Sequence, residues 1–217
     1  MAHLVWDWNG TLLDDLELTV VATNASLATV GGPVTTVEQH RRMFCRPLTE
    51  YYRAVLGRPV DAQEFTHLDE EFHRAYRSGL AACDLARDAL VALDSWPGTQ
   101  SLLSMWSHAE LVVELQRRGL TGRLIRIDGR HGYALGDLKA GYLKRHIAAL
   151  GIAEADCVLV GDAVDDADAA LAVGARCVLY SGGITGVDVL RATGQPVAST
   201  LVEAVTLATA LCNPAAA

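Results

Sequence analysis

Carboxylates follow two apolar segments of this sequence, at points where a buried strand would end. One segment ends at Trp6 and leads directly into Asp7. Another, 157–161, leads into Asp162, and Asp166 follows one helical turn later. A carboxylate at a strand end can act as a nucleophile or bind a metal, and Mg²⁺ prefers such hard oxygen ligands. The alternative is a purely structural role, in which these are turn residues or an acidic helix start that complements the helix dipole.

Two further polar residues have positions that suit the binding of a phosphate group. Ser104 ends the apolar segment 100–104, and its hydroxyl can donate to a phosphate oxygen; Ser107 is a weaker substitute. Lys139 opens a helical pattern, and the only other lysine of the chain is Lys144. A compact ammonium can neutralise a carboxylate and a bound phosphate together. The residue types therefore point to chemistry on a phosphorylated ligand.

The segments that carry these residues alternate with helical patterns. Apolar strand-like segments occur at 4–8, 100–104, 123–128, 157–161 and 177–180. Between the later ones, Leu111 and Leu115 share one helical face, and Leu143 and Ile147 share another. Strands that alternate with helices predict an α/β fold, a Rossmann-like parallel sheet with helices on both faces.

A long helical stretch interrupts this alternation just after the first strand. Residues 14–93 contain no convincing strand, so we predict an α-helical insert there and a core formed by 1–13 and 94–217. One predicted helix has capping-box spacing at its start and an apolar face: Asp61, Glu64, Phe65, Leu68, Phe72 and Tyr76. An insert at this point lies over the carboxyl ends of the parallel strands, where open α/β sheets bind ligands.

Composition limits the classes of partner. The chain has 217 residues, of which 51% are hydrophobic, and a formal net charge of −8. An acidic chain without a basic stripe repels nucleic acid. No apolar run is long enough for a membrane span or a signal peptide. Five scattered cysteines predict neither a disulfide framework nor structural zinc. We expect a cytoplasmic protein, monomeric or dimeric, with a small phosphorylated substrate.

In chain order, these motifs resemble those of the haloacid dehalogenase superfamily of hydrolases. The matching residues are Asp7 to Leu12 (Asp-Trp-Asn-Gly-Thr-Leu), Ser104, Lys139 and Gly161-Asp162 to Asp166. The helical insert after the first motif resembles the α-helical cap of the subgroup that includes phosphoglycolate phosphatases. The resemblance covers about residues 4 to 185.

The resemblance implies a phosphatase with a covalent intermediate and a metal. Asp7 would attack phosphorus and become phosphorylated. Mg²⁺ would be bound by Asp7, the backbone carbonyl of Asn9 and Asp162. Asp166 would support the metal site without contacting the ion directly. The residues implied to hold the phosphoryl group or substrate are Ser104, Lys139 and Thr11. Such a site agrees with what phosphoryl transfer needs, which is positioning and charge neutralisation.

Asn9 departs from the pattern of the family. Its phosphatases usually have a second Asp at this place, which protonates the leaving oxygen and later activates water. An amide does neither, and general acid–base catalysis contributes about 10²–10⁴-fold. Three interpretations follow: the substrate has a good leaving group, such as an anhydride, acyl or aryl phosphate; another acid serves, with His108 the nearest candidate; or the chain is a catalytically weakened protein that binds a phosphorylated ligand.

The insert is expected to select the substrate. Residues 44–48 form a predicted loop that faces the core, because Pro47 interrupts the helix and favours an extended Arg46. Arg46 could clamp a second anionic group of the substrate. A solvated surface arginine is the equally acceptable alternative.

Overall fold

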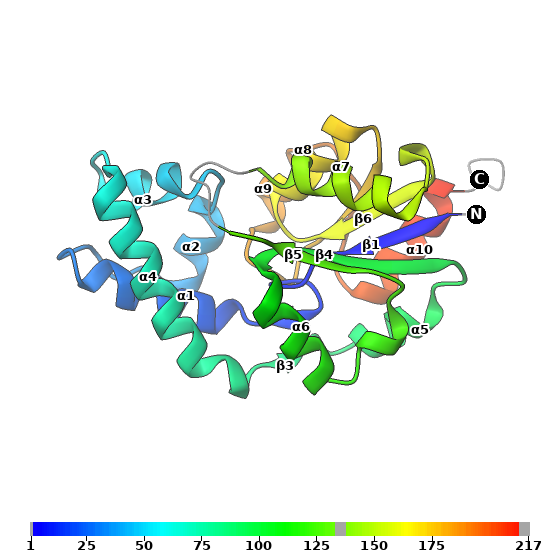
Figure 1. Ribbon diagram of the computed structural model, residues 1–217. Helices are drawn as coiled ribbons and strands as arrows, with labels where there is room; N and C mark the ends of the chain where they lie inside the picture. Colours follow the sequence, from blue (N-terminus) through cyan, green and yellow to red (C-terminus); the bar gives the residue numbers. More distant parts are fainter. Residues whose placement is uncertain (1, 133–137, 213–217) are drawn as a thin grey trace.

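A computed structural model describes residues 2–132 and 138–212 of the chain. Its central sheet has six parallel strands in the order β5-β4-β1-β6-β7-β8 (Figure 1). The strands are β1 (His3–Trp6), β4 (Thr99–Ser107), β5 (Ile127–Arg130), β6 (Cys157–Gly161), β7 (Arg176–Tyr180) and β8 (Val197–Ala198). The predicted fold class is confirmed.

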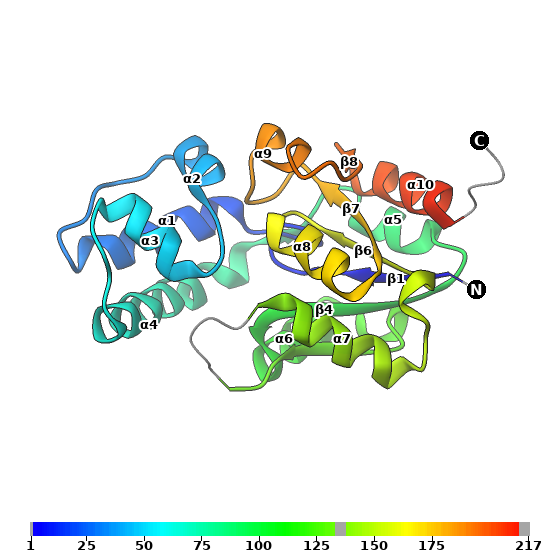
Figure 2. The ribbon, with the colours of Figure 1, turned by 90° about the horizontal axis from the view of Figure 1, so that it is seen from above.

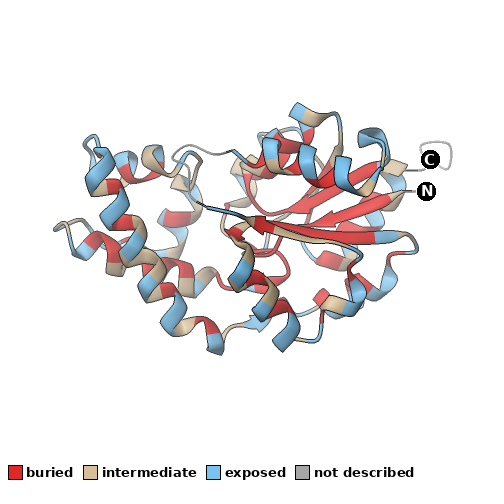
Figure 3. Ribbon diagram, in the orientation of Figure 1, coloured by how far each residue is buried: buried red, intermediate tan, exposed pale blue. Residues whose placement is uncertain are grey.

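Helices cover both faces of this sheet. Along β1, Leu4 and Trp6 enter one apolar cluster and Val5 enters the other, because successive side chains of a strand point to opposite faces. The first cluster is covered by α5 (Ala89–Ser95), α6 (His108–Arg117) and α10 (Leu201–Cys212). The second is covered by α7 (Lys139–Leu150), α8 (Val164–Val173) and α9 (Val187–Arg191). The strands between them are largely buried (Figure 3).

Four α-helices lie between residues 15 and 80 of the chain. They are α1 (Leu16–Ala28), α2 (Val37–Met43), α3 (Leu48–Leu56) and α4 (Ala62–Gly79). Their own apolar cluster includes Leu27, Tyr51, Tyr52, Phe65 and Leu68. Two views place these helices at the end of the sheet to which the parallel strands point (Figures 1 and 2). We call α1–α4 the helical insert.

A short antiparallel pair stands where the chain enters and leaves the helical insert. It joins β2 (Leu13–Asp14) to β3 (Asp84–Leu85). The following helix α5 packs beside α10 on the sheet. The domain boundaries at 14 and 93 stay a prediction.

Several predicted strands differ from the structure in extent, and the segment predicted at 4–8 is a strand over His3–Trp6. The segment predicted at 123–128 becomes a strand only at Ile127, although Ile125 N and Arg126 O already bond to β4 at 2.9 Å. Strand β4 continues to Ser107, with a shift of register after Leu103. Among the described helices, none is long and apolar enough to cross a membrane.

Candidate active site

The loop after β1 brings Asp7 to the carboxyl end of the sheet. Asp7 N donates to Val160 O of the neighbouring strand at 2.8 Å, which fixes the residue beside β6. The chain then turns at Gly10, whose φ of 70° is strained for residues with a side chain. A Cβ on Gly10 would also lie 2.2 Å from Asp162 Oδ2. Glycine is therefore required for the loop and Asp162 to approach each other.

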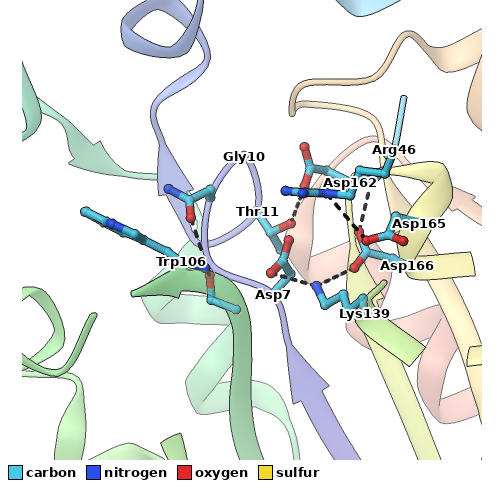
Figure 4. Close-up of polar contacts among 12 residues, drawn as sticks. Asp7, Gly10, Thr11, Arg46, Trp106, Lys139, Asp162, Asp165 and Asp166 are labelled. Carbon is cyan, nitrogen blue, oxygen red and sulfur yellow. Dashed lines mark hydrogen bonds and ion pairs between the residues drawn. The ribbon is translucent and has the colours of Figure 1, made fainter. Parts of the chain in front are cut away.

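Lys139 links two of the predicted site residues. Its Nζ lies 2.8 Å from Asp7 Oδ1 and 2.5 Å from Asp166 Oδ1, and the side chain is almost fully buried. Figure 4 shows the ammonium between the two carboxylates. The start of α7 and the start of α8 thus meet at Asp7.

Asp162 completes a cluster of three buried carboxylates with Asp7 and Asp166. Its two oxygens accept hydrogen bonds from the Thr11 hydroxyl at 3.0 Å and from Ile184 N at 2.6 Å. One oxygen from each of the three carboxylates lies within 4.8 Å of the others. Hard carboxylate oxygens at this spacing are suitable ligands for a divalent cation.

The electrostatics of the cluster also favour a cation. Burial raises the pKa of Asp7 to about 6, with Lys139 opposing the rise and Asp166 adding to it. Burial and the neighbouring Asp7 and Asp166 raise the pKa of Asp162 well above its usual range. Burial opposes the charge of Lys139, but Asp166 and Asp7 outweigh it and raise the ammonium pKa. One buried ammonium faces three carboxylates, so a divalent cation would relieve the excess negative charge.

Asn9 is held by two residues that the sequence did not single out for chemistry. Its Nδ2 donates to Asp15 Oδ2 and to the Tyr76 hydroxyl, both at 2.8 Å. The Tyr76 hydroxyl donates to the same Asp15 oxygen at 2.5 Å, and Gly10 N donates to Asp15 Oδ1 at 2.6 Å. Tyr76 comes from α4, so this network joins the helical insert to the loop that carries Asp7.

Ser104 lies beside this loop in the irregular part of β4. Its hydroxyl is 3.4 Å from Asn9 Oδ1, and it accepts from Trp106 N at 3.1 Å. Ser104 and Lys139 line the same cavity as Asp7 and Asn9. The structure therefore brings together the predicted phosphoryl-binding pair and the candidate nucleophile.

Other predicted residues have different surroundings. Arg46 lines the cavity, but its Nε lies 3.5 Å from Asp165 Oδ2 at the start of α8. Thr11 is fully buried and does not line the cavity. Its hydroxyl donates a hydrogen bond to Asp162. His108 is also absent from the cavity wall; its Nδ1 accepts from Gly129 N at 3.1 Å.

Sequence reasoning missed Asp15 and the aromatic wall of the cavity. Asp15 follows the first motif closely, and its burial is what marks it as unusual. Phe72 and Tyr76 were assigned to the apolar face of a helix, which is correct, but both also line the cavity. Helical spacing identifies a buried face and does not tell a packed core from a cavity wall.

Part of the sequence and the whole fold have known counterparts. Residues 134–204 match the model of a family described as HAD-hydrolase-like. No curated protein sequence matches the chain. A haloacid dehalogenase-like hydrolase from Streptococcus pneumoniae has a similar structure, with a TM-score of 0.81, 15% identity, and coverage of 95% of this chain and 98% of that one.

Two other solved structures are similar over nearly their full lengths. A "predicted phosphoglycolate phosphatase" from Haemophilus somnus aligns with a TM-score of 0.75 and 14% identity, covering 95% of this chain and 97% of its own. A "predicted phosphatase" from Clostridium acetobutylicum aligns with a TM-score of 0.79 and 17% identity, with the same coverage. The predicted resemblance to the haloacid dehalogenase superfamily is thus confirmed, since the chain has the fold of these hydrolases and residues 134–204 match their family model.

Proposed function

We propose that this protein is a Mg²⁺-dependent phosphatase that acts on a small phosphorylated metabolite through an aspartyl phosphate at Asp7. One observation carries the proposal: Asp7 lies in a cavity within 2.8 Å of the Lys139 ammonium, beside Asp162 and Asp166. Phosphoryl transfer depends mainly on positioning and on neutralising charge, and this arrangement supplies both.

The metal would be held by the carboxylates of Asp7 and Asp162 with the backbone carbonyl of Asn9. Asp166 would support it indirectly, because its oxygens already accept from Lys139 and from Ala163 N. When bound, Mg²⁺ would supply positive charge that lets an anionic phosphate approach a carboxylate. Thr11 would act by holding Asp162 in place rather than by binding substrate.

The reaction would proceed in two displacements at phosphorus. In the first, a carboxylate oxygen of Asp7 forms a bond to phosphorus, and the leaving oxygen departs with the electron pair of the broken P–O bond. In the second, water attacks the phosphorus of the aspartyl phosphate, loses a proton, and releases phosphate and the free Asp7 carboxylate. Lys139 and Ser104 would bind the phosphoryl oxygens during both steps.

Asn9 would restrict which esters react quickly. Both hydrogens of its amide are engaged by Asp15 and Tyr76, and the group has no acidic proton to give to a leaving oxygen. The proposal is therefore a phosphatase that favours good leaving groups. The helical insert would act as a cap that closes the cavity over the substrate, supported by its place at the carboxyl ends of the strands.

The second candidate is a catalytically weakened protein that binds a phosphorylated ligand. The amide at position 9 favours it, because an acid–base group at that place would be needed for alkyl esters. The buried and charged cluster of Asp7, Lys139 and Asp162 favours the enzyme, since an exclusively binding site does not need a nucleophile beside its ammonium.

A phosphatase screen separates the two candidates. The purified full chain would be assayed with Mg²⁺ or excess EDTA against alkyl, aryl, acyl and anhydride phosphates, together with Asp7→Asn. If the chain is an enzyme, turnover should require Mg²⁺, and Asp7→Asn should abolish it. Saturable binding of these compounds without turnover would favour the binding protein, and full activity in EDTA would exclude the metal.

A further inference from the structure

The cavity at Asp7 continues between the core and the helical insert. Its volume is about 140 Å³. A cavity of about 150 Å³ accepts one benzene ring, so the space suits a group of about the size of a single ring. The size of the cavity is thus the first limit on the group that carries the phosphate.

Aromatic side chains form much of the wall away from Asp7. Phe72 and Tyr76 stack with ring centroids 5.7 Å apart, and Tyr76 meets Trp106 edge-on at 5.3 Å. Phe44 and Tyr51 form a second aromatic group, with centroids 5.8 Å apart. All five residues line the cavity. Aromatic rings bind another ring by stacked or edge-to-face contact, which favours a flat aromatic ligand.

The charges on the cavity wall oppose a second anionic group. The described residues that line it include five carboxylates: Asp7, Asp15, Asp69, Asp165 and Asp166. The permanent cations on the same wall are three: Arg46, Arg130 and Lys139. Lys139 forms an ion pair with Asp7, and Arg46 forms one with Asp165. The charges of a bound Mg²⁺ and of the substrate's phosphate dianion offset each other, so a carboxylate or second phosphate on the ligand would still meet a net negative wall.

One buried histidine of the cavity wall has a ring nitrogen without a partner among the described residues. His40 lines the cavity and is only 1% exposed. Its Nδ1 is 2.7 Å from the Tyr51 hydroxyl, while its Nε2 is buried without a partner. A buried polar atom without a partner is costly, and this nitrogen lies beside the aromatic residues of the cavity wall.

We propose that the substrate is an aryl phosphate with a single ring and no second anionic group, its ring lying against the aromatic residues of the helical insert and its phosphate at Asp7. This rests on the proposed phosphatase function and specifies its substrate class. The chemistry at Asn9 agrees independently, because a phenolate leaves without the proton that Asn9 cannot donate. Acyl phosphates and anhydrides share the good leaving group but lack the ring.

The first test is a set of matched phosphates assayed with Mg²⁺ on the full chain. Phenyl phosphate tests whether the ring is bound, and acetyl phosphate tests a good leaving group without a ring. The pair 4-hydroxyphenyl and 4-carboxyphenyl phosphate tests the effect of a second negative charge. We expect kcat/KM for phenyl phosphate to exceed that for acetyl phosphate by about 10-fold or more. The hydroxyl compound should exceed the carboxyl compound by a similar factor. Equal kcat/KM values for phenyl phosphate and acetyl phosphate would overturn the proposal. A higher kcat/KM for 4-carboxyphenyl phosphate than for 4-hydroxyphenyl phosphate would overturn it as well.

The second test uses variants of the aromatic wall. Phe72→Leu should raise KM for phenyl phosphate several-fold more than it raises KM for acetyl phosphate. Phe65→Leu is the matched control, because Phe65 packs inside the helical insert and does not line the cavity. It should leave the ratio of the two KM values as in the wild type. A change of that ratio in Phe65→Leu equal to that in Phe72→Leu would show a general effect of packing and overturn the assignment.

A binding measurement separates failure of this inference from failure of the proposed function. Calorimetry would compare phenylphosphonate, which is not hydrolysed, with methylphosphonate in the presence of Mg²⁺. We expect the phenyl compound to bind about 10-fold tighter. If no phosphate is turned over but this preference is found, the phosphatase proposal fails and the ring site stands. If phosphates are turned over but the two phosphonates bind equally, only the aryl assignment fails.

Discussion

At the scale of single residues, Asn9 and Asp15 form a complementary pair. The amide of Asn9 donates to Asp15 Oδ2, and Asp15 Oδ1 accepts from the backbone of Gly10. The carboxylate thereby fixes the loop that follows Asp7, and the amide removes the repulsion that a second carboxylate would bring. An amide at position 9 thus has a structural partner at position 15.

Exchanging the two groups tests this pairing. Asn9→Asp alone would place two carboxylates across the 2.8 Å now spanned by a hydrogen bond. We expect it to lower the free energy of unfolding by about 1–3 kcal/mol, measured by urea denaturation. The double variant Asn9→Asp with Asp15→Asn keeps one amide and one carboxylate in contact and should regain most of the loss.

The same double variant tests the role of the missing acid. It places a carboxyl at position 9, so turnover of alkyl phosphates should rise about 10-fold or more above wild type. A double variant no more stable than Asn9→Asp would refute the pairing. A wild type that already hydrolyses alkyl and aryl phosphates equally fast would mean that another acid exists.

The carboxylate cluster predicts stabilisation by metal. Mg²⁺ at about 100 times its Kd should add about 2.7 kcal/mol to the free energy of unfolding of the wild type. Asp162→Asn should remove most of this gain, because it deletes one of the three clustered carboxylates. Asp168→Asn is the control, since Asp168 is an exposed residue of the helix α8 that follows Asp162. An equal gain in Asp162→Asn and wild type would be evidence against a metal at this place.

At the scale of elements, the site is assembled from the ends of β1 and β6, the middle of β4 and the start of α7. These elements were predictable, because buried parallel strands are continuous apolar segments and each ends at a polar residue. Strand β6 has the bounds that were predicted, and the helix α4 begins after Asp61, which accepts from Glu64 N at 2.9 Å. Local signals were sufficient for these elements.

Other features could not be obtained from local signals. The contact between Tyr76 and Asn9 joins residues 67 positions apart, and the contact of His40 with Tyr51 depends on how α2 and α3 pack. The start of the helix α2 was not predicted, although Thr36 and Gln39 form a capping box there. The short β5 was predicted to begin too early, because residues before Ile127 bond to β4 without being a strand.

The ion pair between Arg46 and Asp165 predicts a role for Arg46 in joining the helical insert to α8. Arg46→Met should raise KM several-fold for all phosphates alike, because the pair holds the wall of the cavity rather than one substrate group. Arg42→Met is the control, since Arg42 pairs only with Glu38 of its own helix at the surface. Steady-state kinetics on phenyl and 4-carboxyphenyl phosphate would decide. A larger effect on the carboxylate compound would instead assign Arg46 to a second anionic group.

At the scale of the whole molecule, the helical insert contacts the core at several separate places. Tyr76 reaches the loop of Asp7, Arg46 pairs with Asp165, and Gly186 N donates to Arg41 O at 2.8 Å. The Arg41 guanidinium also donates to Ser181 O. These separate contacts hold the helical insert against the core.

Buried histidines should make the stability of the molecule sensitive to acid. Burial lowers the pKa of His40 from 6.5 to about 4. A group that is neutral when folded but takes up a proton when unfolded stabilises the protein above its unfolded pKa. This contribution declines as the pH falls from 6.5 and is lost below about 4. Buried carboxyls such as Asp15, with a pKa raised by burial, act in the opposite direction.

The comparison with a variant isolates the histidine. The stability of wild type relative to His40→Gln should fall by up to about 1.4 kcal/mol for each pH unit in this window. Urea denaturation at a series of pH values would measure it. His67→Gln, at an exposed position of α4, is the matched control. A constant difference between wild type and His40→Gln over the window would disprove the buried neutral state.

The central claim is that Asp7 becomes phosphorylated during turnover. The most direct measurement is acid quenching of the full chain during steady hydrolysis of phenyl phosphate with Mg²⁺, followed by mass spectrometry of its peptides. We predict one added phosphoryl group on the peptide that contains Asp7, absent without substrate and absent in Asp7→Asn, which should also lose turnover. Continued turnover by Asp7→Asn, or a phosphoryl group on a different residue of the chain, would contradict this account.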